Sequence, residues 1–417
     1  MNLALRRINI EKGINLNLVH EDKFDINLLS IYFVLSLDRK DVTKNALLPL
    51  VLERCARSSI VQKKLEKTHN SNVGIRIIKE GEKQIISFTA KGPRFNKLQD
   101  KMVMMELIDI LKSLICTPYS TDDIFSQQFV SREKENLKKI IEDRRINKEI
   151  YVKERCIEEM YRNEKFSIHP LGYIEDLDKI DNVTLYKHYK EILDKAMIEI
   201  FYIGDLDDHL VEYIIDSFKY KRDSVMELSR ESVTGNVQIK NMVYEHLDLD
   251  PGWLVIGYRS GIPYEDILYN GLEVGSYILG GGPNSKLFKM VREKDIAHNM
   301  NCKLYKHKSL MLINGRVNSE DFQKIIAGIR TEIDNLKKGS FTKEDMNISK
   351  QSIKASIKSM YEDKLLFSDF LLGRILIEDG RSLDETLMEI DRVSKDEIVE
   401  ASKSIKADTI YFHGKPI

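Results

Sequence analysis

Three consecutive glycines, Gly280 to Gly282, form the most distinctive short motif of the sequence. They stand between two apolar helical patterns, and Asn284 or Ser285 is predicted to cap the second helix. Glycine lets the backbone take positive φ and lets another chain approach closely. The N-terminus of the following helix would point free N–H groups at whatever lies in front of it. The pattern alone fits a ligand-binding loop and a plain helix–turn–helix connection equally well.

Other kinds of chemistry find little support in the residue spacing. The sequence contains neither a G-x-x-x-x-G-K-[ST] phosphate loop nor a G-x-S-x-G nucleophile motif. No two of the 9 histidines lie three to five residues apart, as a helical pair of metal ligands would. His169 is predicted to be a loop residue, and His298 and His307 are predicted at the surface or in satisfied core positions. Taken by itself, Glu53 is best explained as a partly buried helix glutamate that pairs with a neighbouring base.

The composition is that of a globular protein rather than a nucleic-acid or membrane protein. The chain has 417 residues, enough for two or more domains, and 65 basic against 66 acidic residues give a net charge of −1. Its 4 cysteines form no CxxC pair, so free thiols in a reducing compartment are expected. The sequence shows no membrane-length apolar run and no apolar signal core, which predicts a cytoplasmic protein. Abundant lysine and isoleucine with few prolines suggest a bacterial source.

The elements that must position these residues fall into two similar halves. In the first half, alternating strands, a helix at 45–59, a strand pair, long helices and a buried strand ending at Gly204 are predicted. The second half repeats this plan, and Ile410-Tyr-Phe-His-Gly echoes Ile200-Phe-Tyr-Ile-Gly. The stretch between them is polar and aperiodic. We therefore predict an α+β protein with two homologous domains, each an antiparallel sheet packed by helices, at residues 1–222 and 239–417 with a linker at 223–238.

The glycine motif carries a resemblance to a known family. Gly-Gly-Gly-x-x-Ser-x-Leu-Phe-x-x-Val-Arg-Glu-Lys, which ends at Lys294, resembles the second-domain signature of the pitrilysin/insulinase-type peptidases, in their processing-peptidase-like branch. Weaker matches extend the resemblance from about residue 5 to the C-terminus, and it is closest to the zinc-less bacterial members, the YmfF-like group. The resemblance implies a duplicated fold of the LuxS/metallopeptidase type. It also implies that Gly280, Gly281, Gly282, Asn284, Ser285 and Arg292 line a cavity that holds an extended peptide.

The same resemblance locates the place where a zinc site would be. The family carries H-x-x-E-H on the first-domain helix, and here the segment reads Leu50-Val-Leu-Glu53-Arg54. Glu53 matches the general base, whereas Leu50 and Arg54 fill the two histidine positions. Glu135 and Glu142 resemble the glutamate pair of the family's ligand helix. Leucine has no lone pair and arginine is a permanent cation, so no metal or other cofactor is expected in this chain. The hypothesis is that Arg54 pairs instead with Glu142 or Glu135.

A second departure from the family follows the glycine motif. The family continues Arg-Glu-Lys-x-x-Leu-x-Tyr, whereas this chain runs from Arg292 to Asn299 without the tyrosine. Arg292 can still touch a peptide, but the tyrosine's role has no counterpart.

These expectations favour a protein without catalytic activity of its own. The leading hypothesis is a zinc-less subunit of a peptidase heterodimer, in which a zinc-bearing paralogue supplies the metal and this chain helps to position the peptide. A homodimer is the other arrangement considered. The alternative function is a stand-alone peptide-binding or scaffold protein, and an active metallopeptidase with an atypical site is a third. No nucleic-acid or membrane partner is expected.

Overall fold

The computed structural model describes residues 5–21, 25–57, 72–237, 241–294 and 297–415. They form two compact units, each with its own sheet and hydrophobic core. Unit 1 comprises Met1–Asp143, Ile168–Ser229 and Asp363–Gly373, and unit 2 comprises the remaining segments, Arg144–Ser167, Arg230–Glu362 and Arg374–Ile417. Each unit therefore includes one helical segment from the other half of the chain. The described helices include none long and apolar enough to cross a bilayer.

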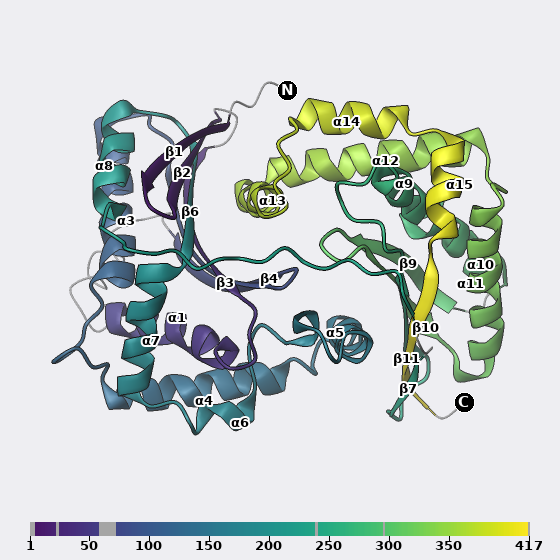
Figure 1. The fold of residues 1–417 in the computed structure, drawn as a ribbon, viewed down its shortest axis with the longest axis horizontal. Helices are drawn as coiled ribbons and strands as arrows, with labels where there is room; N and C mark the ends of the chain where they lie inside the picture. Colours follow the sequence, from purple (N-terminus) through teal and green to yellow (C-terminus); the bar gives the residue numbers. More distant parts are fainter. Residues whose placement is uncertain (1–4, 22–24, 58–71, 238–240, 295–296, 416–417) are drawn as a thin grey trace. The chain divides into compact units, whose positions relative to one another are not determined.

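Unit 1 is built on a six-stranded sheet in the order β1-β2-β6-β3-β5-β4. The strands are β1 (Leu5–Glu11), β2 (Ile14–His20), β3 (Ile26–Ser36), β4 (Asn72–Glu80), β5 (Lys83–Pro93) and β6 (Met197–Gly204). The helices are α1 (Val42–Arg57), α3 (Leu98–Cys116), α4 (Gln127–Asp143), α6 (Ile174–Leu177), α7 (Asn182–Lys195) and α8 (Asp208–Phe218). Alternate residues of the central strands, such as Leu29, Ile31 and Phe33 of β3, meet the apolar faces of α1, α3 and α7 in one continuous core (Figure 1).

Unit 2 is built on a five-stranded sheet in the order β7-β11-β8-β10-β9. The strands are β7 (Asn241–His246), β8 (Gly252–Arg259), β9 (Ala297–Tyr305), β10 (Leu310–Val317) and β11 (Lys406–Gly414). The helices are α5 (Lys148–Met160), α9 (Tyr269–Gly280), α10 (Lys286–Lys294), α11 (Phe322–Lys337), α12 (Lys343–Glu362), α14 (Leu383–Arg392) and α15 (Lys395–Lys403). Helix α13 (Lys364–Leu376) begins in unit 1 and ends in unit 2.

The two sheets share one topology, which supports the predicted duplication. Apart from β1, the first sheet has the order β2-β6-β3-β5-β4, and the second has the corresponding order β7-β11-β8-β10-β9. In each set of five strands, the last strand along the chain lies between the first and the second. In both sheets that pair of first and last strands, β2–β6 and β7–β11, is parallel, and the other described pairs are antiparallel. The predicted α+β class with two helix-packed sheets is confirmed. The purely antiparallel expectation was wrong because strands far apart in the chain, joined through helices, are free to pair in parallel.

Three local features differ from the expectations drawn from the sequence. The sequence after residue 120 predicts one long, highly charged helix to about residue 162. The structure instead has two helices, α4 and α5, separated at 144–147, and Asn147 caps the second. Helix α1 begins at Val42 instead of the predicted residue 45, so Pro49, expected in the first turn, lies in the interior of the helix. Helix α14 was not predicted. The far end of the first predicted helix, residues 58–59, and the start of the predicted strand at residue 240 lie outside the described residues.

The exchanged helical segments make specific contacts within the units that receive them. In unit 1, Asp369 forms two hydrogen bonds of 2.9 Å with the guanidinium of Arg76 and accepts one of 2.8 Å from Tyr32. In unit 2, Tyr151 and Cys156 of α5 are buried in an apolar cluster with Val255 and Tyr411 of the sheet. Each segment is thus part of the core or the hydrogen-bond network of its unit.

Candidate functional site

Helix α1 carries the degenerate motif on the side that its core-facing residues leave open. Leu47, Leu48, Val51, Leu52 and Cys55 are buried against the sheet and its neighbours. Leu50, Glu53 and Arg54 are half-buried and share one face, since residues three and four apart are neighbours on a helix. This is the arrangement that a metal-binding motif of this spacing requires. Two of the three side chains here are of the wrong type for a metal.

Arg54 forms an ion pair across to helix α4. Its Nε and one terminal nitrogen both lie 2.6 Å from Oε1 of Glu133, and Asn136 donates to the other carboxylate oxygen at 2.9 Å. The Glu133 side chain is 4% exposed and that of Arg54 is 30% exposed. Both oxygens of a buried carboxylate are therefore satisfied by protein donors, as a buried charge requires.

The hypothesis of an ion pair across the helices is confirmed, but both predicted partners of Arg54 were wrong. Glu135 and Glu142 are exposed on α4. Val130, Glu133 and Leu137 form the buried face of that helix, and Glu135 is rotated by about 200° from Glu133. Once the face of Val130 and Leu137 is known to be buried, the helical period places Glu133 on that face.

The residues at this place do not suit a zinc ion. Leu50 offers no donor atom, and the fixed charge of Arg54 would repel a dication from the Glu133 carboxylate. In the part of the chain that the structure describes, no group of three or more histidine, cysteine, aspartate or glutamate side chains is arranged to hold a metal. We therefore derive no metal-dependent step for this chain.

The glycine motif occupies the turn between α9 and α10 in unit 2. Gly280 ends α9, and a Cβ there would lie 2.4 Å from the backbone nitrogen of Cys302 on β9. A Cβ on Gly281 would lie 2.4 Å from the ring of Tyr277. Gly282 has φ +142° and nothing lies within 4 Å of its virtual Cβ. Two of the glycines thus permit close packing, and only the third combines an unusual backbone angle with open space.

The turn leads directly into α10 through Ser285. The Ser285 carbonyl accepts from the amide of Lys289, which is the backbone pattern of an N-cap. Its hydroxyl, however, donates to the carbonyl of Gly282 at 2.6 Å and so fixes the turn rather than capping the helix. Asn284 remains exposed. Ser285 therefore occupies the N-cap position through its backbone carbonyl, and the side chain of Asn284 is exposed.

A cavity of about 40 Å³ adjoins the glycine turn. Gly281, Gly282, Asn284 and Ser285 line it together with residues of α12, and nearby the Lys286 ammonium lies 2.7 Å from Asp345. Its volume suits one or a few water molecules rather than a side chain. The predicted residues Gly281 to Ser285 are thus brought together, whereas Arg292 is exposed on α10 and does not line this cavity.

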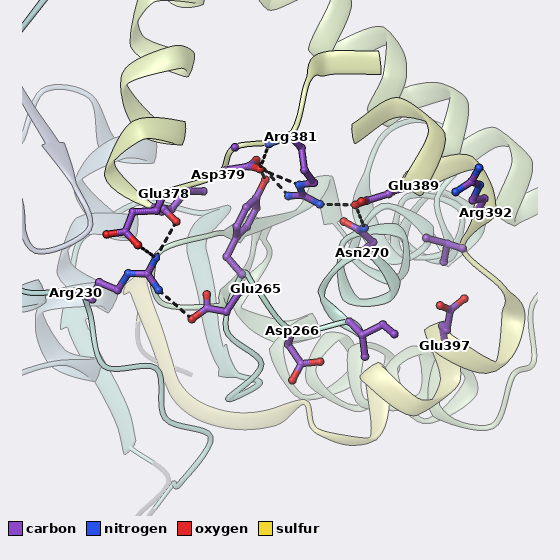
Figure 2. Close-up of a pocket in the computed structure, with 15 residues that line it drawn as sticks. Arg230, Glu265, Asp266, Asn270, Glu378, Asp379, Arg381, Glu389, Arg392 and Glu397 are labelled. Atoms are coloured by element: carbon purple, nitrogen blue, oxygen red, sulfur yellow. Dashed lines mark hydrogen bonds and ion pairs between the residues drawn. The ribbon is translucent and has the colours of Figure 1, made fainter. Parts of the chain in front are cut away.

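A larger pocket of about 650 Å³ lies elsewhere in unit 2 and was not predicted from the sequence. Figure 2 shows two sets of ion pairs in its wall: Arg381 binds Asp379 and Glu389, and Arg230 binds Glu265 and Glu378. Burial alone would raise the pKa of Asp379, but hydrogen bonds from Arg381 and Tyr264 outweigh this effect and lower that pKa below its usual value. These ion pairs join a loop at 377–381 to neighbouring elements, so the pocket wall is a stabilising network. No motif marks it in the sequence.

Comparisons with known proteins agree with the geometry. Residues 179–353 match the family described as Peptidase M16 inactive domain. The probable inactive metalloprotease YmfF of Bacillus subtilis (strain 168) is 29% identical over 407 residues, covering 96% of this chain and 95% of YmfF.

Two solved structures share the fold over nearly the whole chain. A conserved protein from Enterococcus faecalis V583 has a TM-score of 0.86 at 22% identity, with 99% of each chain covered. A chain of complex III2 from Candida albicans, solved with Inz-5 bound, has a TM-score of 0.77 at 14% identity and covers 99% of this chain and 96% of that one. In its topology and over nearly its whole length the chain is thus similar to peptidases of the pitrilysin/insulinase type (M16), and in sequence it is similar to the probable inactive metalloprotease YmfF.

Proposed function

We propose that this chain is the non-catalytic subunit of a two-chain peptidase, in which a zinc-bearing paralogue supplies the metal. The observation that carries the proposal is the ion pair between Arg54 and Glu133. Arg54 stands at one of the two histidine positions that the resemblance implies, and it binds a buried carboxylate. Leu50 stands at the other position. The chain holds no cofactor of its own in this proposal.

The contribution of this chain is to bind the peptide through the glycine turn. Gly282 to Asn284 present backbone groups and one exposed amide at the N-terminus of α10, where free N–H groups can meet a peptide carbonyl or carboxylate. Support for an assembled role comes from the fold relative in complex III2, which is itself one chain of a larger complex. The partner is a chain with an intact H-x-x-E-H motif.

The test is isolation of the tagged chain from its native host, followed by identification of the proteins that come with it. We expect a homologous chain with H-x-x-E-H in equal amount, and we expect its peptidase turnover to rise when the two chains are mixed. Elution of this chain alone or as a homodimer, without effect on the turnover of any such homologue, would refute the proposal and leave the stand-alone peptide-binding role.

The glycine turn is tested in the same mixture by Asn284→Ala. We expect KM for the peptide to rise several-fold with little change in kcat, because the lost contact is made before the chemical step. Lys289→Gln, at an exposed position of α10, is the matched control and should change neither constant. Equal KM and kcat values for Asn284→Ala and the control would show that the glycine turn does not contact the peptide substrate.

A further inference from the structure

A second cavity in unit 2, of about 540 Å³, lies between helix α11 and strands β8 and β11. Its volume is within the range of about 300–1,000 Å³ that holds small organic ligands. Most of its wall is apolar. The apolar residues that line it are Val237, Ile256, Tyr258, Ile326, Ile333, Ile405, Ala407 and Ile410.

Tyr258 gives this apolar wall one polar atom without a partner. Its side chain is 6% exposed, and its hydroxyl makes no hydrogen bond to any residue that the structure describes. The hydroxyl oxygen is not among the fully buried, unpaired polar atoms of the described residues, so it keeps contact with solvent and can exchange a water molecule for a ligand acceptor. Burial raises the pKa of Tyr258, so the hydroxyl keeps its proton and can donate it to an acceptor in the cavity.

The charges on the wall of the cavity are predominantly positive. Arg330, Lys337 and Lys406 line it together with a single carboxylate, Asp334. Lys337 donates to the carbonyl of Ile405 at 2.8 Å, and Arg330 and Lys406 are exposed. None of these three cations forms an ion pair within the described ranges of the chain. Arg330 and Tyr258 both line the cavity, and the charge of Arg330 opposes the effect of burial on the pKa of Tyr258.

We propose that this cavity binds a long-chain carboxylate, with the alkyl chain along the isoleucine wall and the carboxylate at Arg330 and the Tyr258 hydroxyl. An apolar wall, one unpaired hydroxyl donor and an excess of cations together match an amphipathic anion better than a neutral or a fully polar ligand. The site is separate from the glycine turn, and it stands or falls independently of the proposed peptidase role.

The first experiment titrates the purified full chain with dodecanoate, dodecanol and butyrate by calorimetry, below the concentration at which dodecanoate self-associates. We expect saturable, one-to-one binding of dodecanoate. Dodecanol, which lacks the charge, should bind about tenfold more weakly, and butyrate, which lacks most of the chain, should not bind measurably. Absence of dodecanoate binding, or equal affinity for dodecanol, would overturn the proposal.

The second experiment assigns the binding to this cavity. Arg330→Gln is chosen because the side chain is exposed, and it should raise the dissociation constant for dodecanoate about tenfold while that for dodecanol is unchanged. Tyr258→Phe keeps the ring and should weaken dodecanoate binding several-fold. Lys338→Gln, exposed at the end of the same helix but not lining the cavity, is the matched control.

Two outcomes of the variant series would contradict the site. One is a dissociation constant for Arg330→Gln equal to that of the Lys338→Gln control. The other is undiminished binding by Ala407→Trp, whose indole would fill the cavity. Unfolding midpoints of all variants without ligand show whether any loss of binding comes from loss of the fold.

Discussion

Arg54 stands where the resemblance puts a histidine, and its partner is the buried carboxylate of Glu133. A buried carboxylate without its counter-charge is strongly unfavourable, whereas removing both charges together is often nearly neutral. The single variants Arg54→Leu and Glu133→Leu, compared with the double variant, test whether loss of one partner destabilises the fold more than loss of both.

We expect Arg54→Leu to lower the free energy of unfolding by about 1–3 kcal/mol, because Glu133 stays buried without its main donor while Arg54 is itself partly exposed. The double variant Arg54→Leu/Glu133→Leu should recover most of that loss, as a double-mutant cycle in urea would show. Glu135→Gln, exposed on the same helix, is the control and should stay within about 0.5 kcal/mol of the parent. A stable single variant would mean that the pair contributes nothing.

His188 gives a second residue-scale prediction, about pH. It is buried, its Nε2 lies 2.6 Å from the Asn45 side chain, and burial lowers its pKa to about 4 despite the nearby charge of Asp41. The unfolded chain therefore binds this proton at a higher pH than the folded chain. Stability due to neutral His188 is complete above pH 6.5 and is lost as the pH falls toward 4.

The expected loss over this range is up to about 3 kcal/mol, measured by urea unfolding at several pH values. His188→Gln should flatten the slope of stability against pH between 6.5 and 4. The same change at exposed His209 should leave the slope as it is. A slope that is equal in all three proteins would show that His188 does not titrate there.

At the residue scale the sequence predicted the absence of metal donors but not the partner of Arg54. Leu50 and Arg54 can be judged by their chemistry alone. Glu133 could be chosen over Glu135 only by knowing which face of α4 is buried, and its charged neighbours obscure that face in the sequence.

At the scale of elements, the turn between α9 and α10 is set by packing. Gly280→Ala would place a methyl group 2.4 Å from the Cys302 backbone nitrogen, and backbone atoms cannot move aside as a flexible side chain can. We expect it to lower the free energy of unfolding by about 1–3 kcal/mol. Gly380→Ala, where nothing lies within 4 Å of the added atom, is the control and should be nearly neutral. Chemical denaturation of both variants provides the comparison, and equal stability would contradict the close approach.

Most strands and helices followed from periodicity, and the failures have physical causes. The sequence from α4 to α5 is highly charged throughout, and the break between these helices at 144–147 contains no glycine or proline that would mark it. Helix α14 was missed because its apolar face is narrow, with Ile390 as its buried residue. The parallel pairs β2–β6 and β7–β11 depend on contacts between distant strands, which local patterns do not encode.

At the scale of the whole molecule, the notable feature is the exchange of helical segments. Helix α5 comes from the first half of the sequence and belongs to unit 2, and residues 363–373 come from the second half and belong to unit 1. A division of the sequence at 223–238 therefore separates two chain halves but not two independent cores. That division itself stays a prediction.

A protease site inserted after Glu227, an exposed position, tests the consequence. After complete cleavage, we expect both fragments to elute together in gel filtration and to separate only in denaturant, because α5 packs in an apolar cluster of unit 2 and residues 363–373 hydrogen-bond within unit 1. The parent chain without the inserted site, treated with the same protease, is the control. Two separately eluting, folded fragments would contradict the exchange.

The close approach of Gly280 to β9 and of Gly281 to Tyr277 bears on how such genes are classified. Packing alone requires glycine at these two positions, whether or not a chain of this fold carries metal ligands. A genome survey that searches for the triple glycine would therefore collect active enzymes and inactive homologues together, and the side chains of the first-domain helix would be needed to distinguish them.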